Sequence, residues 1–313
     1  MAVYVNTNYS ALQGQRYLGN VQNQLTTTYQ RLSSGMRINS AKDDAAGLQI
    51  ADRLTSQING LNQGNRNASD GIALAQTAEA GMDEISGMLQ KIRTLAVQAN
   101  NGTNTLEDRK ALAKEASSLA TEITRISKQT TFAGKTILNG KQTNSIDPEA
   151  AGGQNLGKTQ TLQLQVGSNK GDTISFNLVN LQFSVAGEAA GIAGVQFKDT
   201  AGTAAFLVKN SEVTVNFSTI GAVQNIISYM DQMIGYVDGQ RADLGAIQNR
   251  LESSIRNQSN VAANEADARS RIRDADFAEE SANLSQQSII QQAAASMLMQ
   301  ANTRPQLGLS LLG

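Results

Sequence analysis

The sequence predicts a mainly α protein: a rod of long antiparallel helices packed as a coiled-coil-like bundle, with paired terminal helices and a small insertion that contains a β-hairpin. Three observations predict this class. Only 2 of the 313 residues are Pro, so long helices meet few breakers. Apolar residues recur at three- and four-residue spacing in both arms of the chain. Between the arms, residues 142–220 are rich in Gly, Thr, Ser and Asn, which is typical of short strands and turns.

The N-terminal arm contains the first two expected helices. The stripe of the first helix comprises Leu18, Val21, Leu25, Leu32 and Met36. The strongest periodicity follows in residues 51–99, where apolar residues keep a heptad-like rhythm with a slip near Ala78. At ~1.5 Å per residue this second helix would be on the order of 70 Å long, which indicates a rod.

Two further helical stripes and one hairpin complete the expected body. The stripes cover residues 112–126 and 223–255, and they can close on residues 51–99 as an antiparallel bundle. The segment "TLQLQVGSNKGDTISFNL" alternates apolar and polar residues on both sides of "GSNKGD", which predicts a β-hairpin. Shorter β-like runs, "VQF" and "EVTVNF", follow among glycines.

The C-terminal helix is apolar on every side between Leu284 and Ala301, so it needs cover all round. Both ends of the chain are also poor in charge. No acidic residue precedes Asp43, and Arg304 is the one charged residue after Glu280. Depletion of charge is typical of interface cores, so we expect the terminal helices to pair and then to be covered by other copies of the chain. Head-to-tail contacts that do not close a ring would give a helical filament. An ordinary Ala- and Met-rich core helix is the alternative.

Composition excludes several classes of function. The net charge of −1 argues against nucleic-acid binding, and the absence of Cys removes disulfides and thiolate chemistry. Asp43 and Asp44 are adjacent carboxylates, but no His, Cys or nucleotide-binding glycine pattern accompanies them. We therefore expect no enzyme activity, catalytic residue, cofactor or metal. No apolar run approaches ~18 residues, so membrane insertion is not expected.

Several long motifs resemble those of one family. "LSSGMRINSAKDDAAGLQIADRL" at 32–54 resembles the N-terminal signature of bacterial flagellin, and "SRIRDADFAEESANLSQQSIIQQAAASMLMQAN" at 270–302 resembles its C-terminal signature. "QTTFAGKTILNG", the hairpin and the closing "SLLG" are also similar. The resemblance implies a subunit of the extracellular flagellar filament, which serves motility and whose paired terminal helices line a narrow channel.

The resemblance also implies export and partners. The N-terminus lacks a basic and apolar signal peptide, which agrees with secretion through the flagellar type III apparatus. The implied partners are other copies of the chain, an export chaperone, the filament cap and the hook-junction proteins. The implied domains are terminal axial helices at 1–42 plus 275–313, a rod domain at 43–181 plus 220–274, and a short outer region at 182–219.

Two groups of residues are predicted to build the filament core and its joint with the rod. The subunit-interface group comprises Leu18, Val21, Leu25, Leu32, Leu284, Ile289, Ile290, Met297 and Leu298. The joint group comprises Arg31, Arg37, Asp43, Asp44, Arg271, Arg273 and Asp274, with Lys42 and Asp276 nearby. Charges of one arm could pair with those of the other arm or of adjacent copies. Exposed pairs of this kind contribute only ~0–1 kcal/mol each, and a solvated charged loop is the alternative.

A third group resembles the surface that host flagellin-sensing Toll-like receptors recognise. By position in "LQKIRTLAVQ" and the following helix, the contact residues would be Gln90, Lys91, Arg93, Leu95 and Glu115. Lys91 stands where an arginine is usual, and the two side chains differ in donor geometry, so we expect weaker receptor recognition. The alternative is a surface used only for packing within the filament.

Two other functions stay open from the sequence. A hook–filament junction protein shares the terminal signatures but should not polymerise alone. A membrane-active protein could use apolar terminal helices, but these helices lack the Lys- and Arg-rich faces that interfacial binding generally uses.

Overall fold

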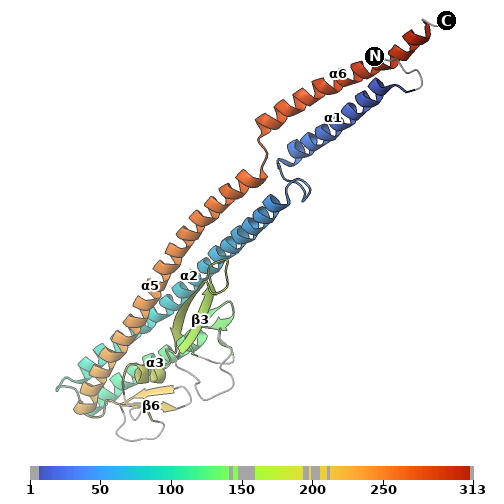
Figure 1. Ribbon diagram of the computed structural model, residues 1–313. Helices are drawn as coiled ribbons and strands as arrows, with labels where there is room; N and C mark the ends of the chain where they lie inside the picture. Colours follow the sequence, from blue (N-terminus) through green and yellow to red (C-terminus); the bar gives the residue numbers. More distant parts are fainter. Residues whose placement is uncertain are drawn as a thin grey trace. The chain divides into compact units, whose positions relative to one another are not determined.

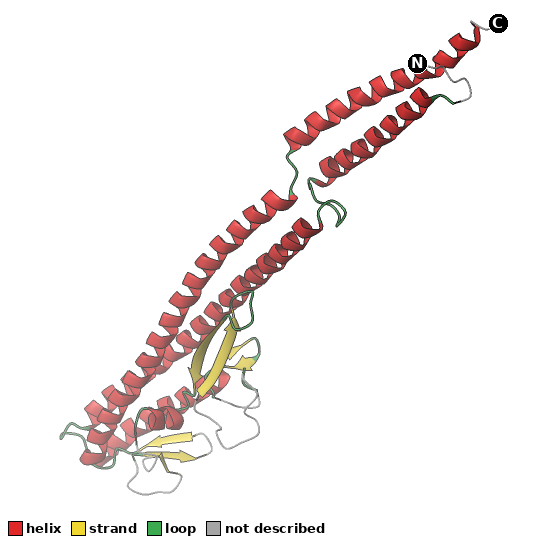
Figure 2. Cartoon of the chain, viewed as in Figure 1, coloured by secondary structure: helices red, strands yellow, loops and turns green. Residues whose placement is uncertain are grey.

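The computed structural model describes residues 7–140, 144–146, 159–192, 197–198, 205–209 and 212–310. The fold is mainly α, which confirms the predicted class (Figures 1 and 2). The helices are α1 (Tyr9–Ser34), α2 (Ala45–Ala99), α3 (Leu106–Gln129), α4 (Phe183–Ala189), α5 (Ile220–Arg273) and α6 (Phe277–Ser310). The chain divides into two compact units, one formed by Met1–Asn59 with Asn260–Gly313 and the other by Gly60–Ser259.

The first unit contains α1, α6 and the adjoining ends of α2 and α5. The side chain of Asn8 begins α1 by accepting a hydrogen bond from the Ala11 N–H at 3.1 Å. Gly35 ends it in the left-handed conformation, with φ of 71°, and donates its N–H to the Arg31 carbonyl at 2.8 Å. Asp276 begins α6, because its carboxylate accepts from the Ala278 N–H at 2.8 Å. Both terminal helices therefore have defined ends next to the turns that connect them to α2 and α5.

The second unit is built on an antiparallel pair formed by α2 and α5. Their direction follows from contacts along both helices: Arg93 with Asp231, Arg241 with Asp83, and Asn65 with Ser259. The core between the helices includes the buried side chains of Met82, Ile85, Leu89, Ile92, Met230, Met233 and Val237. α3 adds Ile123 to the same core, and its N-terminus carries a capping box between Thr105 and Asp108. The predicted bundle is thus formed by the predicted stripes.

The strands lie in the second unit and form small sheets. The predicted hairpin is β3 (Thr159–Gln165) with β4 (Thr173–Val179), paired antiparallel with Leu162 opposite Phe176. β1 (Thr131–Phe132) pairs with β2 (Lys135–Thr136). In the third sheet β6 (Phe206–Lys209) lies between β5 (Phe197–Lys198) and β7 (Glu212–Val215). The predicted strand "EVTVNF" is therefore confirmed as β7. Of the run "VQF", Val195 and Gln196 lie outside the described residues, and Phe197 begins β5.

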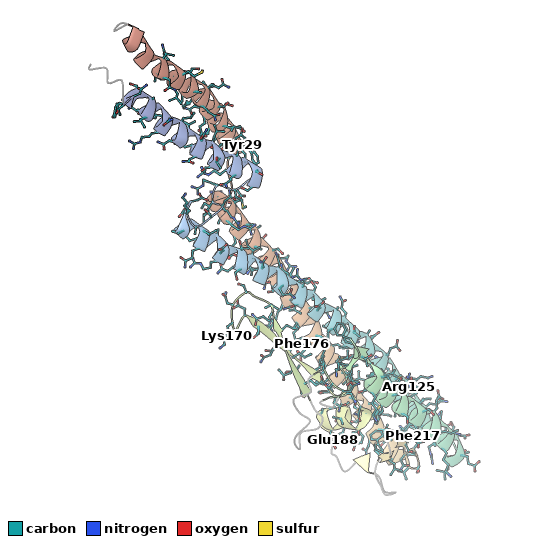
Figure 3. The ribbon with its side chains drawn as sticks, turned by 90° about the vertical axis from the view of Figure 1, so that its right-hand side faces the viewer. Tyr29, Arg125, Lys170, Phe176, Glu188 and Phe217 are labelled. Atoms are coloured by element: carbon teal, nitrogen blue, oxygen red, sulfur yellow. The ribbon has the colours of Figure 1, made fainter. Side chains whose placement is uncertain are left out.

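The segment predicted as a short outer region contributes to the core of the second unit. Phe183 in α4 packs edge-to-face on Phe206 with ring centroids 5.1 Å apart. Phe217, which is labelled in Figure 3, is also buried. The outer edge of β7 is covered by α3 rather than by another strand. Val213 and Val215 donate their N–H groups to the hydroxyls of Thr121 and Ser117, at 3.2 and 2.8 Å. These hydroxyls accept hydrogen bonds from N–H groups of the edge strand β7 that would otherwise be open to pairing with another strand.

The hairpin lies directly against the backbone of α2. A Cβ placed at Gly64 would be 2.0 Å from the Val166 carbonyl oxygen, and one at Gly60 would be 2.7 Å from the Ser168 Cβ. At Gly71 the nearest atom is the Leu164 Cδ1 at 2.2 Å. Asn67, on the same helix, donates its side-chain amide to the Gln165 carbonyl at 2.8 Å. Glycine is therefore favoured on this face because the hairpin and its turn approach the helix too closely for a side chain.

Candidate functional site: the paired terminal helices and their joint

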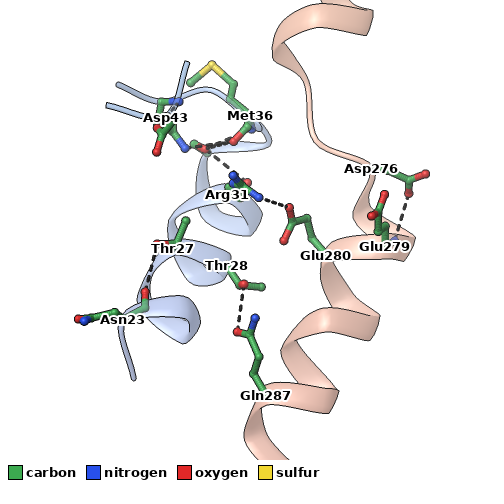
Figure 4. Close-up of polar contacts among 12 residues, drawn as sticks. Asn23, Thr27, Thr28, Arg31, Met36, Asp43, Asp276, Glu279, Glu280 and Gln287 are labelled. Atoms are coloured by element: carbon green, nitrogen blue, oxygen red, sulfur yellow. Dashed lines mark hydrogen bonds and ion pairs between the residues drawn. The ribbon is translucent and has the colours of Figure 1, made fainter. Parts of the chain in front are cut away.

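α1 and α6 run antiparallel in close contact along a shared seam. Near one end of the seam, Asn8 donates its side-chain amide to the Ala301 carbonyl at 2.8 Å. Near the other, the Thr28 hydroxyl donates to the Gln287 side-chain oxygen at 3.2 Å (Figure 4). Between them the helices approach closely, because a Cβ at Gly14 would lie 3.2 Å from the Leu298 Cδ1. The seam therefore combines apolar packing with polar contacts that fix the register.

The predicted subunit-interface residues divide between this seam and the open surface. Val21 and Leu25 are buried, and the half-buried members are Leu18, Leu32, Leu284 and Leu298. Ile289, Ile290 and Met297 remain 67%, 43% and 70% exposed, and Met299 is 66% exposed. One side of α6 is thus covered by α1, while large apolar side chains project from the rest of the helix. Their role between subunits stays a prediction.

One ion pair links the two helices at the joint. The Arg31 Nη1 lies 2.9 Å from the Glu280 Oε1, and the Glu280 side chain is only 8% exposed (Figure 4). Arg31 belongs to the predicted joint, but Glu280 does not. A signal for Glu280 was present, because it is the last acidic residue before the charge-poor end of the chain. A buried carboxylate needs a cationic partner.

The segments around residues 35–38 and 272–275 are joined mainly by their backbones. Met36 and Asp274 form an antiparallel bridge. The Arg37 N–H donates to the Arg273 carbonyl at 2.7 Å, and the Ala275 N–H donates to the Gly35 carbonyl at 3.0 Å. The Arg37 guanidinium also donates to the Ile272 carbonyl at 2.6 Å. The structure therefore brings Arg37, Arg273 and Asp274 together, through main-chain hydrogen bonds rather than charge pairs.

Other predicted joint residues have partners within their own segment. Asp43 accepts hydrogen bonds from the N–H groups of Ser40 and Asn39, which hold the pKa of its carboxyl below the usual range. The ionised form closes this turn, so the contribution of Asp43 is present at neutral pH and is lost as the pH falls through the lowered pKa. Asp44 accepts from the Gly47 N–H at 2.9 Å at the start of α2. These contacts replace the cross-arm pairs considered from the sequence, and pairing with adjacent copies stays a prediction.

Arg271 also has a local partner. Its guanidinium lies 3.0 Å from the Asp267 carboxylate, one turn earlier on α5, and both side chains are exposed. Arg271 therefore makes no described contact with the other arm, unlike Arg31. The joint depends on one largely buried ion pair and on main-chain hydrogen bonds, and much less on its exposed charges.

The residues predicted to contact a host receptor lie in the second unit. Gln90 is exposed, and Lys91 pairs with Glu115 at 3.4 Å with both side chains about half exposed. Arg93 pairs with Asp231 at 2.5 Å. Leu95 differs, since it is 7% exposed and packs in the core between the helices. Its apolar side chain at helical spacing fits the stripe of α2, and its contact with a receptor stays a prediction.

The described residues form neither a metal site nor a membrane span. Within the described residues, no group of three or more His, Cys, Asp and Glu side chains could hold a metal ion. No described helix combines the length and the apolar character needed to cross a membrane.

Comparisons with known proteins identify the family of the chain. The family model of the bacterial flagellin N-terminal helical region matches residues 5–143, and that of the C-terminal helical region matches residues 227–312. The chain belongs to the bacterial flagellin family. This flagellin is 36% identical to polar flagellin C of Vibrio parahaemolyticus and 37% identical to flagellin A of Vibrio cholerae, and each alignment covers the whole of both chains.

A solved structure supports the fold alone. A protein from Vibrio parahaemolyticus, provisionally assigned as flagellar hook-associated, matches 74% of this flagellin and 100% of its own chain. The TM-score is 0.54 and the sequence identity is 16%. Flagellins are structural components of the flagellar filament, so the expected class of structural protein agrees with the family.

Proposed function

We propose that this flagellin self-assembles into the flagellar filament of a motile bacterium and that neighbouring copies cover the open side of α6. The exposure of Ile289, Met297 and Met299 supports this proposal. Each fully buried side chain of this size contributes about 1.5–3 kcal/mol, so several together can drive assembly. In this proposal residues 1–42 and 275–313 form the axial core, residues 43–181 and 220–274 surround it, and residues 182–219 face outward.

The same surface accounts for the proposed handling of the subunit before assembly. A helix with large exposed apolar side chains is prone to premature association, so an export chaperone would shield α6. Export through the flagellar type III apparatus would then deliver the chain to the filament cap outside the cell. Hook-junction proteins would contact the terminal helices of the first subunits. The proposed role is structural throughout, with no enzymatic step.

The double substitution Ile289→Gln and Met297→Gln should block or weaken filament formation without unfolding the monomer. Both side chains are mostly exposed in the single chain, so their loss removes little packing there. We expect the critical concentration for polymerisation to rise about tenfold or more, which corresponds to ~1.4 kcal/mol per subunit. Seeded polymerisation followed by sedimentation and negative-stain microscopy measures this change. Gln286→Ala, at an exposed polar position of the same helix, is the matched control.

The outcomes distinguish the proposed function from its alternatives. A parent chain that stays monomeric while a reference flagellin polymerises under the same conditions would favour a hook–filament junction protein. Co-flotation of the parent with liposomes, lost in the double variant, would favour a membrane-active protein. Normal polymerisation of the double variant would show that this side of α6 is not a subunit contact.

We also propose that host flagellin-sensing Toll-like receptors bind the face formed by Gln90, Lys91, Arg93 and Glu115. Three of these side chains are charged and accessible on neighbouring helices, which supports a polar contact surface. Leu95 would act through the core packing that positions this face.

Lys91→Arg should increase receptor activation. Arginine offers five N–H donors in a planar fork, whereas lysine offers one compact ammonium group. One additional hydrogen bond would lower the flagellin concentration that gives half-maximal receptor activation by roughly two- to tenfold. A receptor-reporter cell assay on monomeric protein measures the effect, with Lys110→Arg on α3 as the same chemical change outside the proposed face. Equal potency of the parent and Lys91→Arg would contradict the proposed effect of lysine at this position.

A further inference from the structure

The sequence contains three Asn-Gly pairs, and the fold places them in different surroundings. They are Asn59-Gly60, Asn101-Gly102 and Asn139-Gly140. Asn59 and Gly60 lie inside the continuous helix α2. Asn101 and Gly102 lie in the exposed turn between the end of α2 at Ala99 and the start of α3 at Leu106. An asparagine followed by glycine is chemically labile, because glycine has no side chain to hinder attack by its own backbone nitrogen.

The turn at Asn101 leaves the reacting groups accessible. The Asn104 N–H donates to the Asn101 carbonyl at 3.1 Å and closes the turn around Gly102. The Thr103 N–H lies 3.5 Å from the Asn101 side-chain oxygen, so it can stabilise negative charge that develops on this oxygen. Across the described part of the chain, no atom accepts a hydrogen bond from the Gly102 N–H. The nucleophile is therefore free, and its target carbonyl has a donor nearby.

We propose that Asn101 is a site of spontaneous deamidation in the folded protein. The Gly102 backbone nitrogen attacks the Asn101 Cγ, so that an N–Cγ bond forms, the bond from Cγ to the side-chain nitrogen breaks, and ammonia leaves. Water then opens the resulting succinimide at either carbonyl and gives Asp or isoaspartate at position 101. The net reaction consumes one water and releases one ammonia, and no enzyme is needed.

The other two pairs are protected by their structure. The Gly60 N–H is engaged in the hydrogen-bond ladder of α2, and the helical backbone holds it away from the Asn59 Cγ. At the third pair, the Asn139 side-chain oxygen accepts a hydrogen bond from Gln182, and Gly140 is buried with its carbonyl bound by the Gln160 side chain. Succinimide formation at either position would require local unfolding.

The product at position 101 is compatible with the fold. The new carboxylate lies in the exposed turn that follows α2, so it stays in contact with solvent and is not buried without a partner. The start of α3 is held by its own capping box, in which Thr105 and Asp108 satisfy each other's backbone groups. The modified protein therefore stays folded, and a more acidic form accumulates with the age of the molecule.

The test is to incubate the purified full chain at mildly alkaline pH and physiological temperature and to map deamidation by peptide mass spectrometry that resolves isoaspartate. We expect the deamidated fraction at Asn101 to exceed that at Asn59 and Asn139 by about tenfold or more, which corresponds to a barrier difference of at least ~1.4 kcal/mol. In concentrated urea the three sites should react at similar rates, because the protection of Asn59 and Asn139 is structural.

Gly102→Ala supplies the matched control. A Cβ at this position would meet no atom within 4 Å, so the variant should fold normally while its methyl group hinders the attacking nitrogen. We expect its deamidation at Asn101 to fall to the level of the protected sites. Intact Asn101 in the parent, equal modification of all three sites in the folded state, or an unchanged rate in Gly102→Ala would each overturn the proposal.

Discussion

Gly64→Ala is expected to displace the β3–β4 hairpin from α2 and to lower the free energy of unfolding by about 2 kcal/mol or more. The added Cβ would lie 2.0 Å from the carbonyl oxygen of Val166 and 2.6 Å from its carbonyl carbon. These are backbone atoms of the hairpin, at the residue that follows β3, so no rotamer change relieves the clash. Alanine favours the helix by ~1 kcal/mol over glycine, but that gain is smaller than the cost of moving the strand.

Two other glycines of α2 make this prediction specific. Gly87 has no atom within 4 Å of a placed Cβ, so Gly87→Ala should raise the free energy of unfolding by about 0.5–1 kcal/mol. At Gly71 the clash is with the Leu164 Cδ1, the far end of a flexible side chain, so Gly71→Ala should cost less than Gly64→Ala. Urea unfolding followed by circular dichroism ranks the three variants. A Gly64→Ala protein as stable as the Gly87→Ala protein would show that the hairpin does not lie against this backbone.

The helices and the hairpin were predictable because each repeats one local rule. Helical spacing places Ile85, Leu89 and Ile92 on one face of α2, and they are buried there. Alternation around "GSNKGD" likewise gave the paired strands β3 and β4. Both patterns depend on which residues face the core, and the spacing of the apolar residues along the sequence shows this directly.

The glycine face of α2 was not predictable in the same way. A glycine inside a helix usually only weakens it. The sequence around Gly64, which lies against the hairpin, does not distinguish it from Gly87, where an added Cβ would meet no atom within 4 Å. The difference depends on a hairpin roughly a hundred residues further along the chain. The burial of Leu95 was also missed. The resemblance of its segment to a receptor-binding surface suggested an exposed residue, whereas its side chain packs in the core.

The two segments that the motifs placed at the joint are hydrogen-bonded to each other, but not in the way that the sequence suggested. Charge in "SSGMRINSAKDD" and "SRIRDAD" suggested side-chain pairs between the arms, whereas Arg37 and Arg273 meet through main-chain atoms. Almost every residue type has the same main-chain N–H and carbonyl groups, so the sequence alone does not show where main-chain hydrogen bonds form. Asp43 and Asp44 follow the strong preference of aspartate for nearby backbone N–H groups in turns and at helix starts.

Arg31→Glu should separate the ends of α1 and α6 at the joint. The substitution places a second carboxylate beside Glu280, whose side chain is 8% exposed and then has no cation. Breaking a buried ion pair costs about 3–5 kcal/mol, and we expect the lower end, ~3 kcal/mol, because Arg31 is itself 31% exposed. Amide hydrogen exchange on the full chain should show this as faster exchange in the last turns of α1.

The exposed pair on α5 provides the matched control. Arg271→Glu places a second carboxylate beside Asp267. The Arg271–Asp267 distance of 3.0 Å is similar to the 2.9 Å between Arg31 and Glu280, but both side chains of the control pair are mostly in solvent. Its cost should stay within about 1 kcal/mol, and exchange in α1 should not change. If the two charge reversals had the same small effect, burial of Glu280 would not contribute to the pairing of the terminal helices.

Variants of Glu280 test whether Arg31 pairs with Glu280 of its own chain or of another copy. Glu280→Arg alone should be as damaging as Arg31→Glu, while Arg31→Glu with Glu280→Arg in one chain restores opposite charges and should recover most of the protection of α1. A mixture of the two single variants should recover none, because Arg31 and Glu280 of the same chain face each other across the seam. Recovery of protection or assembly in that mixture would mean that α1 and α6 exchange partners between copies, and the seam would then be a contact of the polymer instead of the single chain.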